Sequence, residues 1–145
     1  MYIFLDVDGV LNRESDWHKH FTLNPECIAN FKELVKHIPD AKIVLSSTWR
    51  NGIARDGKKA KHIEDLISRI EAAGIHTVDK TAYSPDGNRS REIEYFLKRH
   101  EKDNYIILDD DRSIFDKGTS NLYIIDSIKG ITSDDVTRII KSINR

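Results

Sequence analysis

The chain has 145 residues, of which 39% are hydrophobic and 32% are charged, and its formal net charge at neutral pH is −1. This length and balance predict one globular domain with a substantial core, and the small net charge argues against a protein that coats nucleic acid without specificity. No apolar stretch approaches the roughly 20 residues that a membrane-spanning helix needs, so no contact with a membrane is expected.

The expected elements alternate between strands and helices along the chain. Apolar runs predict strands over residues 1–5, 41–45, 75–78, 105–108 and 122–125. The first helix is expected to be capped by Asn24 and to begin at Pro25, after a polar loop from Asn12 to Asn24. Later apolar residues at helical spacing predict a second helix near residues 63–70 with Gly74 as its stop signal, a third after residue 88, and a closing helix over residues 133–143.

This alternation predicts an α/β fold over residues 1–145 as a single domain. The expected architecture is a Rossmann-like three-layer sandwich, in which helices cover both faces of a mainly parallel five-stranded sheet. The single cysteine, Cys27, excludes an internal disulfide and fits a reducing cytoplasm. Because the first strand begins at Met1, no room for a targeting segment is expected, which also favours a cytoplasmic protein.

Polar residues stand where three of these strands end. The pairs are Asp6 and Asp8, Ser46 and Ser47, and Asp109 and Asp110. Ligands of open α/β sheets bind at the carboxyl ends of the strands, so these residues are expected to share one site. Burying unpaired carboxylates is costly unless a cation or a reaction uses them. Hard carboxylate oxygens in this number suit Mg²⁺, whereas the scattered His and Cys residues fit no tetrahedral zinc site.

Four segments carry a resemblance to a known family. They are Asp-Val-Asp-Gly-Val-Leu-Asn from Asp6, Ser-Ser-Thr-Trp-Arg from Ser46, Arg-Ser-Arg-Glu-Ile from Arg89, and Ile-Leu-Asp-Asp-Asp ending at Asp111. In order and spacing they resemble the motifs of the haloacid dehalogenase-like (HAD) phosphatase superfamily. More narrowly, they are similar to the small capless HAD domains of Swiss Army knife RNA-repair proteins and to relatives of polynucleotide phosphatases.

The resemblance implies a Mg²⁺-dependent phosphomonoester hydrolase. Asp6 would be the nucleophile that forms an aspartyl-phosphate, and Asp8 would act as general acid and then as general base. The side chain of Asp6, the backbone carbonyl of Asp8, and Asp109 or Asp110 would hold Mg²⁺. Ser46 would donate its hydroxyl to a phosphate oxygen.

The family also uses a basic residue near the start of the third helix. Lys80, Arg89 and Arg91 all qualify by position. Arg89 is preferred, because it lies beside an expected helix N-terminus and because a guanidinium binds phosphate through two hydrogen bonds. Lys80 is the alternative.

Four further residues are expected to bind the substrate: Gly9, Ser47, Trp49 and Arg50. Gly9 lets the backbone turn sharply and approach a ligand closely. For two of them a structural role is equally well supported, with Trp49 packed beneath the loop and Arg50 paired with an acid. The loop that follows the first strand, which carries Trp17, lies where the superfamily has a mobile flap, although simple exposure to solvent is the more economical interpretation.

The expected absence of a cap domain bears on the substrate. Larger relatives insert a cap after the first or the third strand, but here residues 12–24 and 81–88 are too few for a folded domain. An open site admits bulky substrates, and together with the repair-like motifs this favours a nucleotide or nucleic-acid phosphate, such as an RNA or DNA terminus. The sequence leaves open the oligomeric state and whether the domain works beside a kinase or a ligase.

Two other functions remain as alternatives. The first is a non-catalytic phosphate-binding or regulatory module with the same fold, against which the intact acids argue. The second is a receiver-like phospho-acceptor domain. In such a domain the second acid of the pair Asp6 and Asp8 would have no role.

Overall fold

The computed structural model describes residues 1–145. Five strands of the chain form one sheet with the order β3-β2-β1-β4-β5. The strands are β1 (Tyr2–Leu5), β2 (Lys42–Leu45), β3 (Val78–Lys80), β4 (Tyr105–Asp109) and β5 (Leu122–Ile124). All of the strand pairings are parallel. The expected Rossmann-like α/β fold is therefore confirmed.

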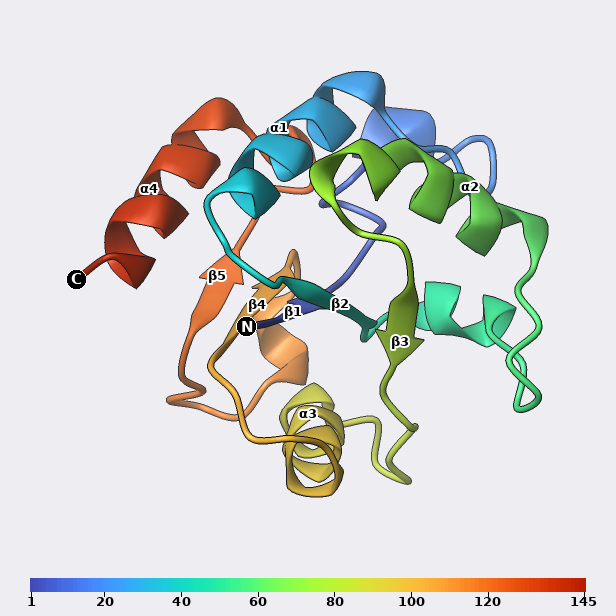
Figure 1. Cartoon of the computed structure of the whole chain (residues 1–145), viewed down its shortest axis with the longest axis vertical. Helices are drawn as coiled ribbons and strands as arrows, with labels where there is room; N and C mark the ends of the chain where they lie inside the picture. Colours follow the sequence, from blue (N-terminus) through green and yellow to red (C-terminus); the bar gives the residue numbers. More distant parts are fainter.

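Four α-helices cover the two faces of the sheet. They are α1 (Pro25–Lys36), α2 (Lys61–Ile70), α3 (Arg89–Arg99) and α4 (Ser133–Ile143). Helices α1, α2 and α4 lie together on one face, and α3 lies alone on the other (Figure 1). None of the helices has the length and apolar character that crossing a membrane requires.

The strand β1 divides its side chains between two hydrophobic clusters, because successive residues of a strand point to opposite faces. Ile3 and Leu5 join a cluster of 26 buried residues beneath α1, α2 and α4. Tyr2 and Phe4 join a cluster of 7 buried residues, which also includes Phe96 of α3. The unequal clusters follow from the unequal number of helices on the two faces.

The third strand does not lie where the sequence predicted it. The prediction was residues 75–78, whereas β3 spans Val78–Lys80. After α2 the chain forms a 3-10 helix over Glu71–Ala73 and then turns at Gly74, whose backbone is left-handed with φ of 92°. Ile75 is buried in the core, but the chain reaches the sheet only at Val78, which lies opposite Ile43 of β2. An apolar core residue upstream of the strand was thus mistaken for its beginning.

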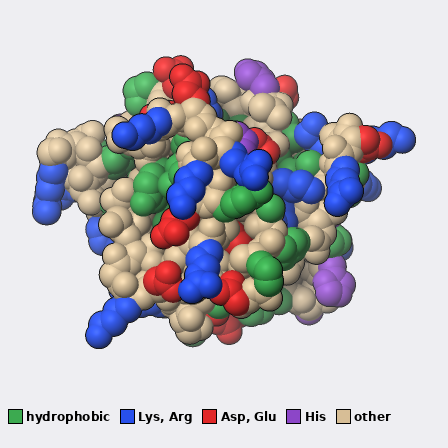
Figure 2. All heavy atoms as spheres, turned by 90° about the horizontal axis from the view of Figure 1, so that it is seen from below, with side chains coloured by type: hydrophobic (Ala, Val, Ile, Leu, Met, Phe, Trp, Pro, Cys, Tyr) green, Lys and Arg blue, Asp and Glu red, His purple; other side chains and the backbone are tan.

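Charges of both signs are spread over the surface. On the face shown in Figure 2, Lys and Arg side chains lie among Asp and Glu side chains, as the net charge of −1 leads one to expect. Lys and Arg side chains gather toward the upper right of this view.

The loop after β1 is fixed at its base. The Arg13 guanidinium donates to the carbonyl of Lys129 at 2.9 Å and pairs with Glu26 of α1 at 2.6 Å. The N–H of Glu14 donates to the carbonyl of Ser127 at 2.9 Å. These contacts tie the start of the loop to α1 and to the segment that precedes α4.

The aromatic packing beneath α3 gives a stability prediction. The Phe96 ring meets the rings of Tyr2 and Phe4 edge to face, with centroids 5.4 and 5.5 Å apart. We expect Phe96→Ala to lower the free energy of unfolding by about 3–5 kcal/mol, because it leaves a cavity beside the sheet. Urea unfolding measures this loss. Tyr95→Ala, at an exposed site of the same helix, is the control, and an equal loss in both variants would contradict the prediction.

Candidate active site

The register of the sheet brings the polar strand ends to one level. Leu5 of β1 lies opposite Leu45 of β2 and Leu108 of β4. The residues that come next, Asp6, Ser46 and Asp109, therefore lie side by side at the carboxyl edge of the sheet. This is the edge at which ligands of parallel α/β sheets bind.

Three carboxylates converge at this edge. Asp6, Asp109 and Asp110 each place an oxygen so that the three atoms lie within 4.8 Å of one another. Asp6 and Asp109 are buried, and Asp110 is half-buried. Hard oxygen donors in this number and at this spacing fit a divalent cation with oxygen ligands. This acidic cluster is thus able to hold a metal ion.

Burial and mutual repulsion disfavour ionisation within the acidic cluster. Burial, and after it the neighbouring Asp109 carboxylate, raises the pKa of Asp6 well above its usual value. Burial also raises the pKa of Asp109 to about 6, although the N–H of Asp111 and the Arg89 guanidinium act in the opposite direction. The cluster holds more negative charge than its protein partners neutralise, which is the condition that a bound cation relieves.

Asp8 lies outside the acidic cluster. One of its carboxylate oxygens accepts hydrogen bonds from the Asn12 amide at 2.9 Å and from the Trp49 indole N–H at 3.1 Å. The buried Asn12 also donates to the carbonyl of Thr22, and its own oxygen accepts from the N–H of Gly9 and from the Trp17 indole. All of the hydrogen-bonding groups of the Asn12 amide are used, so this residue fixes the orientation of Asp8.

Gly9 has a conformation and a neighbour that exclude other residues. Its φ is +86°, and a Cβ at this position would collide with the carboxylate of Asp110. The turn after Asp8 therefore requires glycine for two separate reasons, backbone conformation and the close approach of the acidic cluster.

The hydroxyls after β2 lack partners. Ser46 and Ser47 are buried, and neither Oγ atom has a hydrogen-bond partner within the protein. Buried hydroxyls are normally paired, so this pair is suited to an external acceptor such as a phosphate oxygen.

The three candidate basic residues have different surroundings. Arg89, the first residue of α3, donates to Asp109 at 3.2 Å, and its buried Nε has no hydrogen-bond partner. Lys80 donates to the carbonyl of Ile53. Arg91 pairs with the exposed Asp86 at 2.7 Å. Of the three, Arg89 alone contacts the acidic cluster, and its phosphate-binding role stays a prediction.

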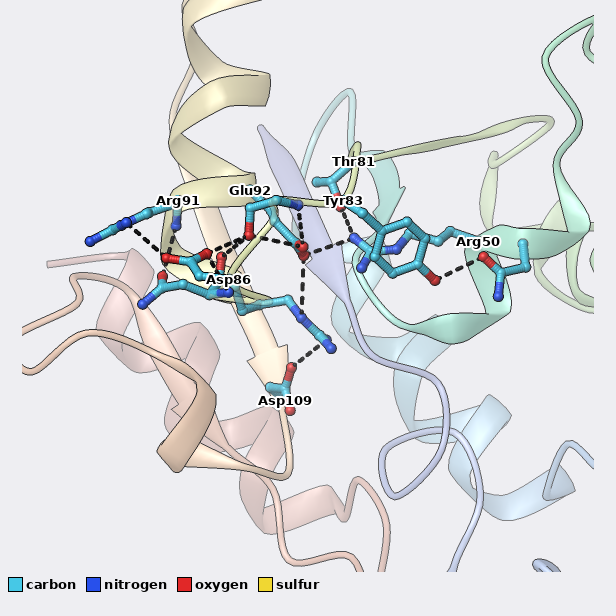
Figure 3. A network of polar contacts seen from close by, with 11 residues as sticks. Arg50, Thr81, Tyr83, Asp86, Arg91, Glu92 and Asp109 are labelled. Atoms are coloured by element: carbon cyan, nitrogen blue, oxygen red, sulfur yellow. Dashed lines mark hydrogen bonds and ion pairs between the residues drawn. The ribbon is translucent and has the colours of Figure 1, made fainter.

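Arg50 belongs to a buried network centred on Glu92 (Figure 3). The Arg50 guanidinium donates to Glu92 at 2.9 Å and to the Thr81 hydroxyl, and it stacks on the Tyr83 ring at 3.5 Å. Glu92 also lies 3.8 Å from the Nε of Arg89, so one carboxylate serves two guanidinium groups. Arg50 thus has the acidic partner that the sequence left open, and the buried Trp49 reaches Asp8 through its indole N–H.

Glu92 and Asn12 are site residues that the sequence analysis did not single out. A signal for Glu92 was present, because an acid one residue before Ile93 and four before Phe96 falls within the buried stripe of α3. Asn12 is the last residue of the motif that begins at Asp6, but nothing in the sequence shows that its amide holds Asp8.

Comparison with known families supports this geometry. Residues 2–136 match the family described as the HAD domain in Swiss Army Knife RNA repair proteins. The chain belongs to this family. Searches among curated proteins and among solved structures return no match. Membership of this HAD family indicates a hydrolase of the phosphatase type, and it agrees with the strand-end acids and with the parallel sheet.

The raised pKa values predict how the metal-free protein responds to pH. An unfolded Asp titrates near about 3.9, whereas folding raises the pKa of Asp109 to about 6. The stabilisation from this group is therefore fully present below about pH 4 and is lost as the pH rises through about 6. In EDTA, the melting temperature should fall between about pH 5 and pH 7.5. Mg²⁺ should restore it, and more so at the higher pH.

Two variants test whether the acidic cluster causes this loss. Asp6→Asn removes one repelling carboxylate, so in EDTA at about pH 7.5 it should melt above the wild-type protein and depend less on pH. Asp134→Asn, at the exposed start of α4, should follow the wild type. A wild-type melting temperature that changes with neither pH nor Mg²⁺ would contradict the prediction.

Gly9→Ala tests the close approach of the turn to the acidic cluster. The left-handed backbone alone should cost about 1–3 kcal/mol of unfolding free energy. The collision with Asp110 should in addition weaken Mg²⁺ binding, measured by calorimetry, by about tenfold or more. Gly57→Ala is a matched control, since Gly57 has the same φ of +86° but no atom within 4 Å of an added Cβ. Equal metal affinity in the two variants would refute the proposed clash.

Proposed function

We propose that the protein is a Mg²⁺-dependent phosphomonoester hydrolase that works through an aspartyl-phosphate on Asp6. The observation that carries the proposal is the separation of two neighbouring acids into different surroundings. Asp6 lies in the buried acidic cluster, whereas Asp8 lies outside it and is held by Asn12 and Trp49. A nucleophile and a proton donor need such different environments on one chain segment.

In the first step, a carboxylate oxygen of Asp6 attacks phosphorus and forms the new bond as the bond to the leaving oxygen breaks. Asp8, in its protonated form, gives its proton to that oxygen, and the alcohol departs. In the second step, Asp8 takes a proton from water, and the water oxygen attacks phosphorus. The bond to Asp6 then breaks, which releases inorganic phosphate and restores both acids.

The remaining residues of the site bind the phosphoryl group. The unpartnered hydroxyls of Ser46 and Ser47 are available to donate to its oxygens, and Arg89 supplies positive charge from the start of α3. Asp6, Asp109 and Asp110, with the carbonyl of Asp8, would hold Mg²⁺. When bound, the ion supplies positive charge that stabilises the phosphoryl oxygens in the transition state.

The openness of the site supports a bulky substrate. Residues 12–24 contain only a 3-10 helix, Glu14–Asp16, ahead of α1, and residues 81–88 contain no helix or strand, so neither segment forms a cap. A site without a cap accommodates the end of a polymer. We therefore propose a nucleotide or nucleic-acid phosphate, with an RNA or DNA terminus as the first choice.

Phosphate release from a substrate panel tests this function. The panel holds 3′- and 5′-phosphorylated oligonucleotides, mononucleotides, sugar phosphates and phosphopeptides, each with Mg²⁺ or EDTA. We expect Mg²⁺-dependent release, with a loss of at least about 1000-fold in Asp6→Asn, because the nucleophile is removed. Asp134→Asn should retain wild-type rates. No release across the panel, with Mg²⁺ binding intact, would refute the hydrolase and favour a phosphate-binding module.

A further inference from the structure

A cleft of about 560 Å³ opens directly beside the proposed general acid. It lies between the loop after β1 and the segment that joins β2 to α2. Asp8 and Asn12 line it, together with five rings: Trp17, His20, Phe21, Trp49 and His62. Because Asp8 is proposed to protonate the leaving oxygen, the group that carries this oxygen must lie on the Asp8 side of the phosphate. The cleft is therefore the space available to the leaving group.

Three of these rings, Phe21, Trp49 and His62, form an ordered aromatic wall. Phe21 stacks on His62, with ring centroids 3.8 Å apart and planes 10° from parallel. Trp49 meets both rings edge to face, with centroids 5.4 and 5.1 Å away. These residues come from the loop after β1, the segment after β2 and helix α2, so the sequence gives no sign of their contact.

Two of the rings are exposed at the mouth of the cleft. Phe21 is 51% and Trp17 is 45% exposed, which makes them two of the few large hydrophobic side chains that face solvent. Phe21 also has a φ of 60°, a conformation that bulky residues rarely adopt. Exposed rings in a concave site next to a catalytic group indicate a surface that a ligand covers.

Polar groups at the cleft define the kind of ring that fits. The Asn51 amide and the Thr48 hydroxyl line it. The Asn51 oxygen accepts from the Tyr83 hydroxyl at 2.8 Å, so the NH₂ group of Asn51 is the part left for a ligand. A purely apolar ring would leave these groups unused, and a sugar alone would leave the aromatic wall in water. A flat heteroaromatic ring with donors and acceptors on its edge uses both.

The surroundings of the cleft suit an anionic ligand. An adjoining hollow shares Lys19, Phe21 and His62 with the cleft and adds Lys61 and Arg69. One acid, Asp65, also lines this hollow and lies 3.4 Å from Arg69. The cationic groups outnumber it, so a phosphate next to the one that is cleaved would meet positive charge here.

We propose that this cleft is a nucleobase subsite, in which the base of the leaving nucleoside stacks on Phe21 and Trp17 while its phosphate reaches Asp6. The proposal rests on the proposed hydrolase function, because that function places the leaving group beside Asp8. Beyond that function, the proposal names the residues that recognise the leaving group and states that they do so by stacking. Stacking of this kind tolerates any base, so the subsite distinguishes nucleotides from simple sugar phosphates without reading sequence.

Intrinsic fluorescence measures occupation of the cleft without turnover. The chain has two tryptophans, Trp17 and Trp49, and both line the cleft. In the Asp6→Asn protein with Mg²⁺, we expect adenosine 3′- or 5′-monophosphate to quench the emission with saturation. Ribose 5-phosphate and inorganic phosphate should not quench it. Adding Phe21→Ala should weaken nucleotide binding about tenfold, whereas adding Tyr95→Ala should leave it unchanged.

Kinetics then separates the subsite from the catalytic centre. The ratio of kcat/KM for the better adenosine monophosphate to that for ribose 5-phosphate should fall about tenfold in Phe21→Ala. Phe21→Tyr keeps the ring and should retain most of the wild-type ratio. Trp17→Ala is a second variant, independent of the unusual backbone of Phe21, and it should lower the ratio in the same direction.

The outcomes distinguish failure of the subsite from failure of the hydrolase. Phosphate release with an unchanged ratio in Phe21→Ala and Trp17→Ala would overturn the subsite and leave the hydrolase standing. Saturable quenching that depends on Phe21, without release of phosphate from any substrate, would support the subsite and refute the hydrolase. The absence of both quenching and release would overturn both proposals.

Discussion

Repulsion among three carboxylates is the constraint around which this edge of the sheet is built. Asp109 is tied to Arg89, and Arg89 lies against Glu92, which also binds Arg50. Negative and positive groups thus alternate from the acidic cluster into the protein interior. Because Glu92 is almost completely buried and serves two guanidinium groups, it sets how far each of them reaches toward the strand ends. This arrangement fixes the positions of the side chains more than it stabilises the fold, because buried ion pairs add little net stability.

Two adjacent acids acquire different surroundings through a local device. The backbone turns at Gly9, and Asn12 then reaches back to hold the Asp8 carboxylate beside Trp49. Asp6 stays with the end of its strand among the other acids. A few residues of one loop therefore separate the proposed nucleophile from the proposed proton donor. The one contribution from a distant segment is the indole of Trp49.

The sequence was sufficient for what depends on periodicity and on sheet geometry. Alternating strands and helices predicted the parallel sheet, and the strand ends then predicted that Asp6, Ser46 and Asp109 would meet. What the sequence could not supply depends on packing between distant segments. The buried stripe of α3 could have marked Glu92 as buried, but not its contacts with Arg50 and Arg89. The stacking of Phe21 on His62 exists only because a loop folds over α2. The predicted position of β3 was wrong for a similar reason, because burial alone does not distinguish a strand residue from a core residue that precedes the strand.

The anchored base of the loop after β1 determines how molecules enter and leave. Arg13 and Glu14 are tied to α1 and to the segment before α4, so the loop has no hinge about which it swings as a body. Its tip is held instead by the stacking of Phe21 on His62 and by the hydrogen bond from Asn12 to the carbonyl of Thr22. Motions of a loop tip take nanoseconds to microseconds, far less than a typical catalytic cycle. Under the proposed mechanism, ligand exchange through the loop is then fast compared with the covalent steps. The turnover of the proposed hydrolase would therefore be limited by its covalent steps and not by entry or exit past the loop.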